Sequence, residues 1–335
     1  MFIINVAFSF LPVLLFLACL FLLDRFRLVE VKTLLLCLVW GILSVLIILL
    51  FNTLISNWIE IDFQIQTRYV APVVEELIKG VVILYLLRKK RIGFLVDAVI
   101  YGFATGAGFA LMENVLYLFT IGSDATAGTW IVRGIGTAIM HGGCTGLLAL
   151  ISITAITRDH QAVPATAYGF VLAVILHSGF NHFVLPPLIQ TLVILTGFPT
   201  IFILLLILIN KNLSGWLEIE FSSEVEILSM IRKGALKETR AGRYLLSIRE
   251  RFSHETVVDL YCYLNLYLEL SIKAKRNLML KENGIKPPYE ADLSDKLNEL
   301  RHIRKRIGPI GEAAISPLIR MNYRDLWKLN QLRQK

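Results

Sequence analysis

Five ionisable side chains stand inside long apolar stretches of the sequence. They are Glu75, Glu76, Glu113, His141 and His177. A charged group at the centre of a membrane helix costs about 2.5–3.5 kcal/mol on insertion scales, so such groups usually mark an ion pathway, a charge pair or an active site. Carboxylates and imidazoles are also the groups that transfer protons in hydrolysis. The five residues therefore predict one shared polar site.

The spacing around these residues indicates how the site is divided. Glu75 and Lys79 are four residues apart, so a charge pair can form along one helix face, while Glu76 points about 100° away. We expect one of the two glutamates to be structural and the other chemical, and the spacing leaves open which. His177 and Asn181 also share a helix face, as two donors to one small group would.

These residue types suit acyl transfer to water. A buried carboxylate can act as a general base, and Asn181 and His177 can donate hydrogen bonds to a developing oxyanion. Two or three carboxylates with two histidines can also hold a divalent ion such as zinc, although the sequence contains no HExxH motif. The residues slightly favour a glutamate-centred mechanism, and a metal-dependent one is the alternative.

The composition places this site in a membrane. The chain has 335 residues, 56% of them apolar and 18% charged, with a mean hydropathy of +0.64. These values exclude an ordinary soluble enzyme. Apolar runs of about 20 residues, the length that crosses a bilayer as a helix, occur at about 2–23, 33–55, 69–87, 94–120, 130–156, 163–184 and 188–209. The sequence predicts an all-α, polytopic membrane bundle of about seven spans.

Residues 211–335 differ from the rest in composition. They carry 23 of the 34 Lys and Arg residues and 16 of the 26 Asp and Glu residues. Apolar residues at three- and four-residue spacing predict helices at 225–236, 243–252, 257–280 and 293–307. We therefore divide the chain into a transmembrane domain, 1–210, and a C-terminal soluble helical domain, 211–335. Nothing in this tail indicates chemistry or binding of nucleic acid.

The connections between the spans alternate in charge. Basic residues gather at 25–32, 88–91 and 158, whereas Glu60, Asp62 and Asp124 mark the connections between them. The positive-inside rule then places the N-terminus outside and the tail in the cytoplasm.

This orientation places the polar residues at one depth. At 1.5 Å per residue, Glu75 and Glu76 lie about 9–10 Å below the outer end of their span, with Glu113 at a similar depth. On the same basis His141 lies about 16 Å down and His177 about 10 Å down. Four antiparallel helices thus deliver their side chains to one layer in the outer half of the membrane. The pairs Gly102-xxx-Gly106 and Gly142-xxx-Gly146 predict that the fourth and fifth spans form the centre of the bundle.

The ordered motifs resemble those of a known family. They are Glu75-Glu76-Leu77-Ile78-Lys79, Phe109-Ala110-Leu111-Met112-Glu113-Asn114, His141, and His177-Ser178-Gly179-Phe180-Asn181. Each stands on a separate span, in the order seen in PrsW-type intramembrane proteases. That family is similar to the CAAX-prenyl endopeptidases and bacteriocin-processing enzymes, although the CAAX enzymes carry a histidine where this chain has Glu113. The resemblance covers about residues 1–210.

The resemblance implies hydrolysis of a peptide bond in the membrane plane. Glu76 or Glu75 would activate water, and His177 and Asn181 would stabilise the oxyanion. The remaining positions implied by the resemblance are Glu113 and His141, which complete the site, and Lys79 and Asn114, which support it. If a divalent metal such as zinc takes part, its ligands would be Glu76, Glu113, His141 and His177. The substrate implied is a membrane-anchored protein, such as an anti-sigma factor, cut on the extracytoplasmic side of a bacterial plasma membrane.

Two other functions compete with this interpretation. Carboxylates and histidines across a bundle also form the proton or cation relays of transporters. A relay should continue through the membrane, whereas here the ionisable groups stop in the outer half. A non-catalytic membrane protein that binds a partner through its tail is the second alternative, and the complete motif set argues against it.

Overall fold

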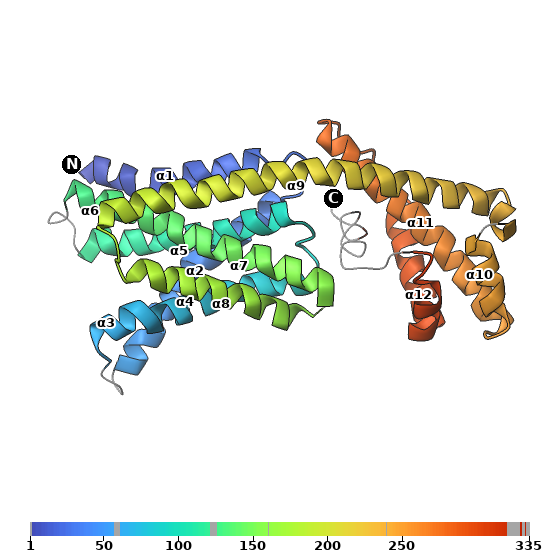
Figure 1. Cartoon of the computed structure of the whole chain (residues 1–335), viewed down its shortest axis with the longest axis horizontal. Coiled ribbons are helices and arrows are strands. Elements are labelled where there is room, and N and C mark those ends of the chain that lie inside the picture. The colour runs from blue at the N-terminus through green and yellow to red at the C-terminus, as the bar shows by residue number, and fades with distance from the viewer. Residues whose placement is uncertain are drawn as a thin grey trace. The chain divides into compact units, whose positions relative to one another are not determined.

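The computed structural model describes residues 2–56, 61–120, 126–159, 161–238 and 240–319, together with Leu329 and Leu332 (Figure 1). Every regular element within these ranges is a helix, which confirms the all-α class. The chain divides into two compact units, Met1–Ile209 and Asn210–Lys335. Glu60 and Asp124, which entered the charge pattern above, lie outside the described residues.

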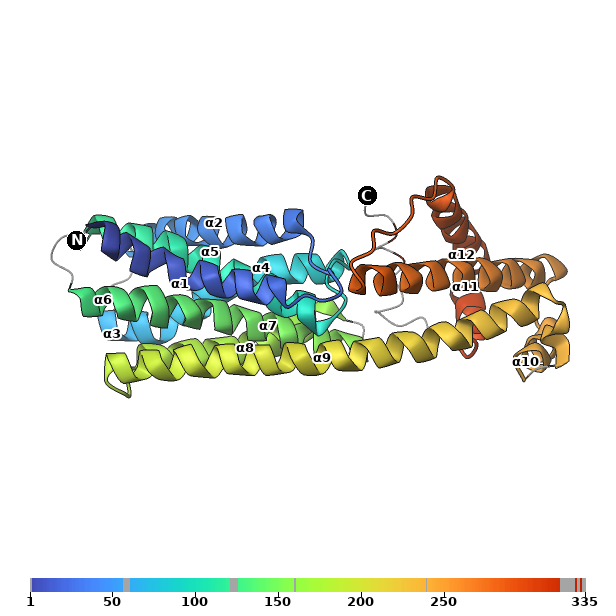
Figure 2. The ribbon, with the colours of Figure 1, turned by 90° about the horizontal axis from the view of Figure 1, so that it is seen from above.

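The first unit consists of helices, the long ones of which run side by side (Figures 1 and 2). In chain order these are α1 (Phe2–Leu22), α2 (Val31–Ser56), α3 (Phe63–Ile65), α4 (Ala71–Arg88), α5 (Leu95–Thr120), α6 (Ala127–Ile131), α7 (Ala138–Asp159), α8 (Ala162–Asn181) and the first part of α9 (Pro187–Arg232). Two π-helical segments join neighbours without a break. The segment η1 (Gln66–Val70) leads into α4, and η3 (Val132–Thr137) leads into α7.

Helix α5 forms the centre of this unit. All of its residues from Val96 to Ala110 are buried, and it packs against α2 and α7, while α7 packs in turn against α8. Glycines allow the close approach of α5 and α7. A Cβ atom at Gly106 would lie 2.1 Å from the carbonyl oxygen of His141, and one at Gly102 would lie 2.5 Å from that of Thr145. The predicted central position of these two helices is confirmed.

Among the described residues, five helices are long and apolar enough to cross a membrane. They are Val31–Thr53, Leu95–Thr120, Gly128–Thr157, Ala162–Asn181 and a stretch within Pro187–Arg232. The other two predicted spans are helices but fall short of this standard. In α1 the apolar stretch, Ser9–Leu22, is too short. Helix α4 contains too many charged residues, namely Glu75, Glu76, Lys79 and Arg88. The chain is a multi-pass helical membrane protein, and length and composition support five of the seven predicted passes.

The second unit contains the end of α9, then η4 (Ala235–Glu238), α10 (Arg240–Arg249), α11 (His254–Glu282) and α12 (Leu293–Ile315). The prediction that a new helix starts at 225 is wrong, whereas the end of the last membrane span near residue 209 stays a prediction. Helix α9 continues to Arg232, because residues 210–232 contain no proline, and it stops before Gly234, whose φ is +70°. Leu264, Tyr267 and Leu300 lie in the buried core of this unit.

One buried charge joins two helices of the second unit. Lys275 of α11 has no exposed surface, and its ammonium lies 2.9 Å from a carboxylate oxygen of Glu220 and 2.8 Å from one of Glu224, both on α9. Ser271 also donates a hydrogen bond to Glu224, at 2.9 Å. This polar cluster fixes how α9 and α11 pack within the unit.

Candidate active site

Four helices bring the ionisable side chains of the first unit together. Helix α4 carries Glu75 and Glu76, α5 carries Glu113, α7 carries His141 and α8 carries His177. Glu76 has no exposed surface, and the two histidines are exposed by 2% or less. The helices α4 and α7 each follow a π-helical segment, and such segments are frequent at functional sites.

Glu76 is the most buried of the three glutamates, and both of its carboxylate oxygens have partners. Its Oε1 accepts hydrogen bonds from Lys79 Nζ at 2.5 Å and from His177 Nδ1 at 2.9 Å. Its Oε2 accepts a hydrogen bond from Thr145, at 3.4 Å. Lys79 therefore pairs with Glu76, three residues away, and not with Glu75 as the spacing had favoured. The reason is that Glu76 and Lys79 both belong to the buried face of α4, where neither charge has water as an alternative partner.

A second carboxylate holds the other imidazole. The Nε2 atom of His141 lies 3.2 Å from Glu113 Oε2, and the same oxygen lies 3.0 Å from the guanidinium of Arg133. The site therefore contains two similar triads, in each of which a cation contacts a carboxylate and the carboxylate contacts a histidine. One is Lys79–Glu76–His177 and the other is Arg133–Glu113–His141.

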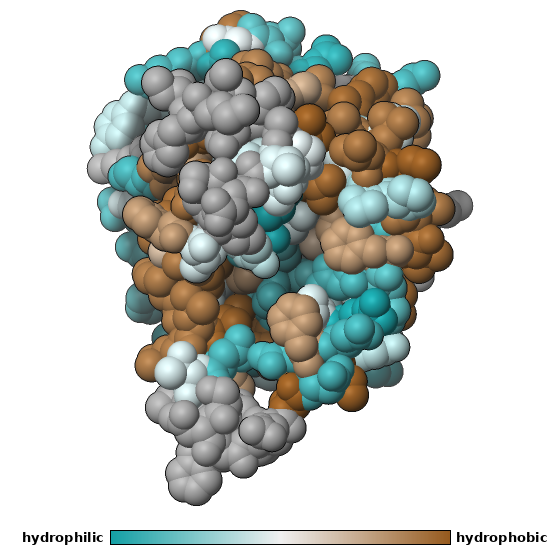
Figure 3. All heavy atoms as spheres, turned by 90° about the vertical axis from the view of Figure 1, so that its left-hand side faces the viewer, coloured by the Kyte–Doolittle hydropathy of each residue, from teal (hydrophilic) through white to brown (hydrophobic). Residues whose placement is uncertain are grey.

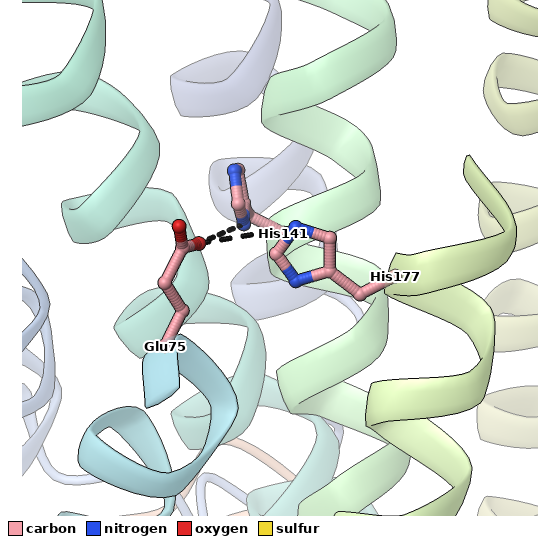
Figure 4. Close-up of side chains that lie close together, drawn as sticks. All are labelled: Glu75, His141 and His177. Atoms are coloured by element: carbon pink, nitrogen blue, oxygen red, sulfur yellow. Dashed lines mark ion pairs between the residues drawn. The ribbon is translucent and has the colours of Figure 1, made fainter. Parts of the chain in front are cut away.

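Glu75 faces the remaining ring nitrogens (Figure 4). Its Oε2 lies 3.8 Å from His177 Nε2 and 4.0 Å from His141 Nδ1, and the ligand atoms of the three residues all lie within 4.8 Å of one another. This oxygen is buried and makes no hydrogen bond to any of the described residues. Its distances to the two nitrogens are too long for hydrogen bonds.

These donors fit a divalent metal ion. Each histidine has one nitrogen next to Glu76 or Glu113 and a second nitrogen that faces Glu75. Metal-binding histidines almost always donate their other N–H to a carboxylate, a backbone carbonyl or water, and Glu76 and Glu113 can accept it here. Zinc binds histidine nitrogen and carboxylate oxygen at about 2.0–2.2 Å, so two ligand atoms of one tetrahedral ion lie about 3.3–3.6 Å apart, slightly closer than the distances from Glu75 to the two nitrogens here. Lys79 Nζ lies 3.2 Å from His141 Nδ1, and this contact would break on binding while the ion pair with Glu76 remains.

The two asparagines of the predicted set have partners in the backbone of other elements. Asn114 donates a hydrogen bond from Nδ2 to the carbonyl oxygen of Ser9, at 2.9 Å, and so ties α5 to α1. Asn181 donates from Nδ2 to the carbonyl oxygen of Thr67, at 2.9 Å. Asn181 lies one turn after His177, and in this structure its amide group binds η1.

Further contacts fasten η1 to the end of α8. Ser178 donates a hydrogen bond to the carbonyl oxygen of Arg68 at 2.6 Å, and His182 Nε2 lies 3.0 Å from the hydroxyl of Tyr69. The site lies toward this end of the bundle, because α4 and η3–α7 begin there and α5 and α8 end there. Figure 3 views this end and shows hydrophilic residues in the middle of the face with hydrophobic residues beside them. The five residues thus lie at one level along the bundle, and their depth in the membrane stays a prediction.

Sequence reasoning missed two residues of the cluster, Arg133 and Thr145. Thr145 lies four residues after His141 on the same helix, so the i,i+4 rule could have found it. In a regular α-helix, Arg133 would stand about 80° away from His141, because eight residues make two turns and a remainder. The π-helical segment η3 holds more residues per turn and reduces this offset. The sequence contains no clear signal for it.

A membrane-embedded bundle with a buried carboxylate and two carboxylate-backed imidazoles has the features of an intramembrane hydrolase that can hold a metal. Comparison with known proteins gives the family. A model described as PrsW family intramembrane metalloprotease matches residues 30–230. The chain belongs to this family, and it is an intramembrane protease. No curated protein and no solved structure matches the chain.

Proposed function

We propose that this protein is a metal-dependent endopeptidase that cleaves a membrane-anchored protein near the extracytoplasmic side of a bacterial plasma membrane. The observation that carries the proposal is the group Glu75, His141 and His177, whose ligand atoms lie within 4.8 Å of one another. Membership of a metalloprotease family supports peptide hydrolysis and a membrane-anchored substrate. The description of the family and the position of Glu75 now favour a metal over the glutamate-centred mechanism.

In this proposal Glu75, His141 and His177 hold the ion, and their donor set suits zinc. A bound ion would supply Lewis-acid chemistry, which polarises the carbonyl of the peptide bond to be cut. Glu76 keeps a proton on His177 Nδ1, and Glu113 keeps one on His141 Nε2, so the opposite nitrogens present lone pairs toward Glu75. The ligand set thus has Glu75 in the place that the sequence had assigned to Glu76 and Glu113.

Asn181 is the proposed oxyanion donor. Its amide nitrogen donates to the Thr67 carbonyl, so this hydrogen bond must break before Asn181 can donate to substrate. Binding of an extended substrate segment beside η1 would supply replacement hydrogen bonds. Asn181→Ala should therefore lower kcat more than it raises KM, because the lost interaction belongs to the transition state.

The proposed topology has seven passes, with residues 1–210 as the transmembrane protease domain and residues 211–335 as a cytoplasmic helical domain. The N-terminus lies outside. Helix α4 can cross the membrane despite its charges because Glu76 and Lys79 neutralise each other and have no exposed surface. Single cysteines placed at residues 62 and 90 should react with an impermeant thiol reagent from opposite sides of the membrane, in a background without the native cysteines.

An anti-sigma factor anchored in the same membrane is the proposed substrate. The experiment compares membrane-protein fragments from cells that carry the wild-type chain, Glu75→Gln, or the control Glu226→Gln at equal expression. Glu226 is exposed on the second part of α9, so its variant should behave as wild type. Fragments cut near the outer membrane boundary should appear with wild type and the control and disappear with Glu75→Gln. Equal fragments in all three samples would refute the proposed function.

A further inference from the structure

Arg133 occupies a specific position at the edge of the site. Its Nη2 lies 3.0 Å from Glu113 Oε2, and its guanidinium carbon lies 3.3 Å from the centre of the Tyr117 ring. The side chain is 14% exposed. A planar cation that both stacks on a ring and meets a carboxylate is held in one orientation.

The two partners of Arg133 come from one face of α5. Glu113 and Tyr117 are four residues apart, so they lie one above the other on that helix. The guanidinium lies over the ring and forms an ion pair with the carboxylate. A lysine would keep the charge at this position but has no planar group that could stack on the Tyr117 ring.

The backbone of η3 brings Arg133 to this position. A regular helix would turn Arg133 away from the face that carries His141, and the π-helical turn from Val132 to Thr137 restores a common side. A π-helical turn has less favourable backbone geometry, so its occurrence at this point is consistent with a functional demand.

We propose that Arg133 is a positioning residue for the metal ligand His141. Arg133 fixes the carboxylate of Glu113, and Glu113 fixes the imidazole, so that His141 Nδ1 points toward Glu75. Glu113 is 23% exposed, and among the described residues Arg133 is the only lysine or arginine within 4.0 Å of its carboxylate. Glu76, by contrast, is fully buried and pairs with Lys79. Without Arg133, the carboxylate can turn toward water and the ring of His141 loses its orientation. This inference rests on the proposed metal site.

The test measures the affinity of the purified protein for zinc by competition with a chromophoric chelator. Replacing an outer residue that orients a ligand typically weakens metal binding by about 10–100-fold. Arg133→Gln should weaken zinc binding by about 10-fold, and Arg133→Lys should give an intermediate loss. Tyr117→Leu should weaken binding, and the matched control Tyr117→Phe, which keeps the ring, should not. The unfolding temperature of each metal-free variant shows whether the fold is intact.

The outcomes separate this inference from the proposed function. If wild type binds zinc, His177→Ala does not, and Arg133→Gln binds as tightly as wild type, the role of Arg133 is refuted while the metal site stands. If wild type and His177→Ala bind zinc equally poorly, the metal site and the inference both fail. A loss of zinc affinity in Arg133→Gln without a matching loss in Tyr117→Phe supports the inference. If Arg133→Gln does not fold, weaker zinc binding by Arg133→Lys and Tyr117→Leu supports the inference, and wild-type affinity in both variants refutes it.

Discussion

Replacing Glu76 by glutamine should destabilise the membrane unit strongly, and removing Lys79 as well should recover most of the loss. Both side chains are fully buried and in direct contact. Removing one partner of a buried ion pair typically costs about 3–5 kcal/mol, because the other charge remains without compensation, whereas replacing both partners is often close to neutral. We therefore expect Glu76→Gln to lose about 3–5 kcal/mol and the pair Glu76→Gln with Lys79→Met to lose much less.

The activity of the double variant should remain low. His177 Nδ1 would then face an amide in place of a carboxylate, and weakening such a support typically lowers metal affinity or activity by about 10–100-fold. The assay combines thermal unfolding in detergent with cleavage of a membrane-anchored reporter, for wild type, both single variants and the double variant. If the double variant is less stable than Glu76→Gln alone, Glu76 and Lys79 do not compensate each other's buried charge. If the double variant cleaves at the wild-type rate, Glu76 does not support the site.

Three other predictions concern packing and charge. Gly106→Ala should destabilise the first unit by about 1–3 kcal/mol or more, because the new Cβ would meet a carbonyl oxygen of α7, while Gly197→Ala, which has open space, should be close to neutral in the same unfolding assay. Lys275→Met should lower the stability of the second unit by about 3 kcal/mol, measured by thermal unfolding, because two glutamates lose their shared cation. The hydrogen bond from Lys273 lowers the pKa of Glu290 below its usual 4.5. The ionised Glu290 therefore contributes its full stabilisation above pH 4.5, and this stabilisation is lost as the pH falls through the lower pKa of the folded state. The free energies of unfolding of wild type and Glu290→Gln should therefore differ at neutral pH and become equal in acid.

The helices of the membrane unit could be predicted because apolar runs and their breaks determine them. The ranges expected for the second, fourth and sixth spans agree with α2, α5 and α8 to within a few residues. The extension of α9 beyond residue 209 could not be predicted from hydropathy, because a helix continues where backbone propensity allows it, whatever its solvent. Loss of apolar content ended the predicted span but did not end the helix.

The cluster of polar residues could be predicted from their cost in a membrane, but the division of labour within it could not. Glu75 and Glu76 are neighbours, and both i,i+3 and i,i+4 partners are within reach of Lys79. Only the packing of α4 against α7 and α8 decides that Glu76 meets the lysine and that Glu75 faces the imidazoles. Arg133 depends on a π-helical turn, which regular helical periodicity does not contain.

The most direct test of the central claim is to measure bound metal and cleavage in the same purified samples. The samples are wild type, Glu75→Gln and Glu113→Gln, each prepared in detergent and analysed for metal content before and after treatment with a chelator. We predict about one divalent ion per wild-type chain, loss of both metal and cleavage in Glu75→Gln, weaker but detectable metal binding in Glu113→Gln, and recovery of wild-type cleavage when zinc is added back after chelation. Full cleavage by metal-free wild type, or a Glu75→Gln variant that keeps its metal and loses only cleavage, would contradict the role of Glu75 as a ligand. The second of these results would make Glu75 the general base of a glutamate-centred mechanism.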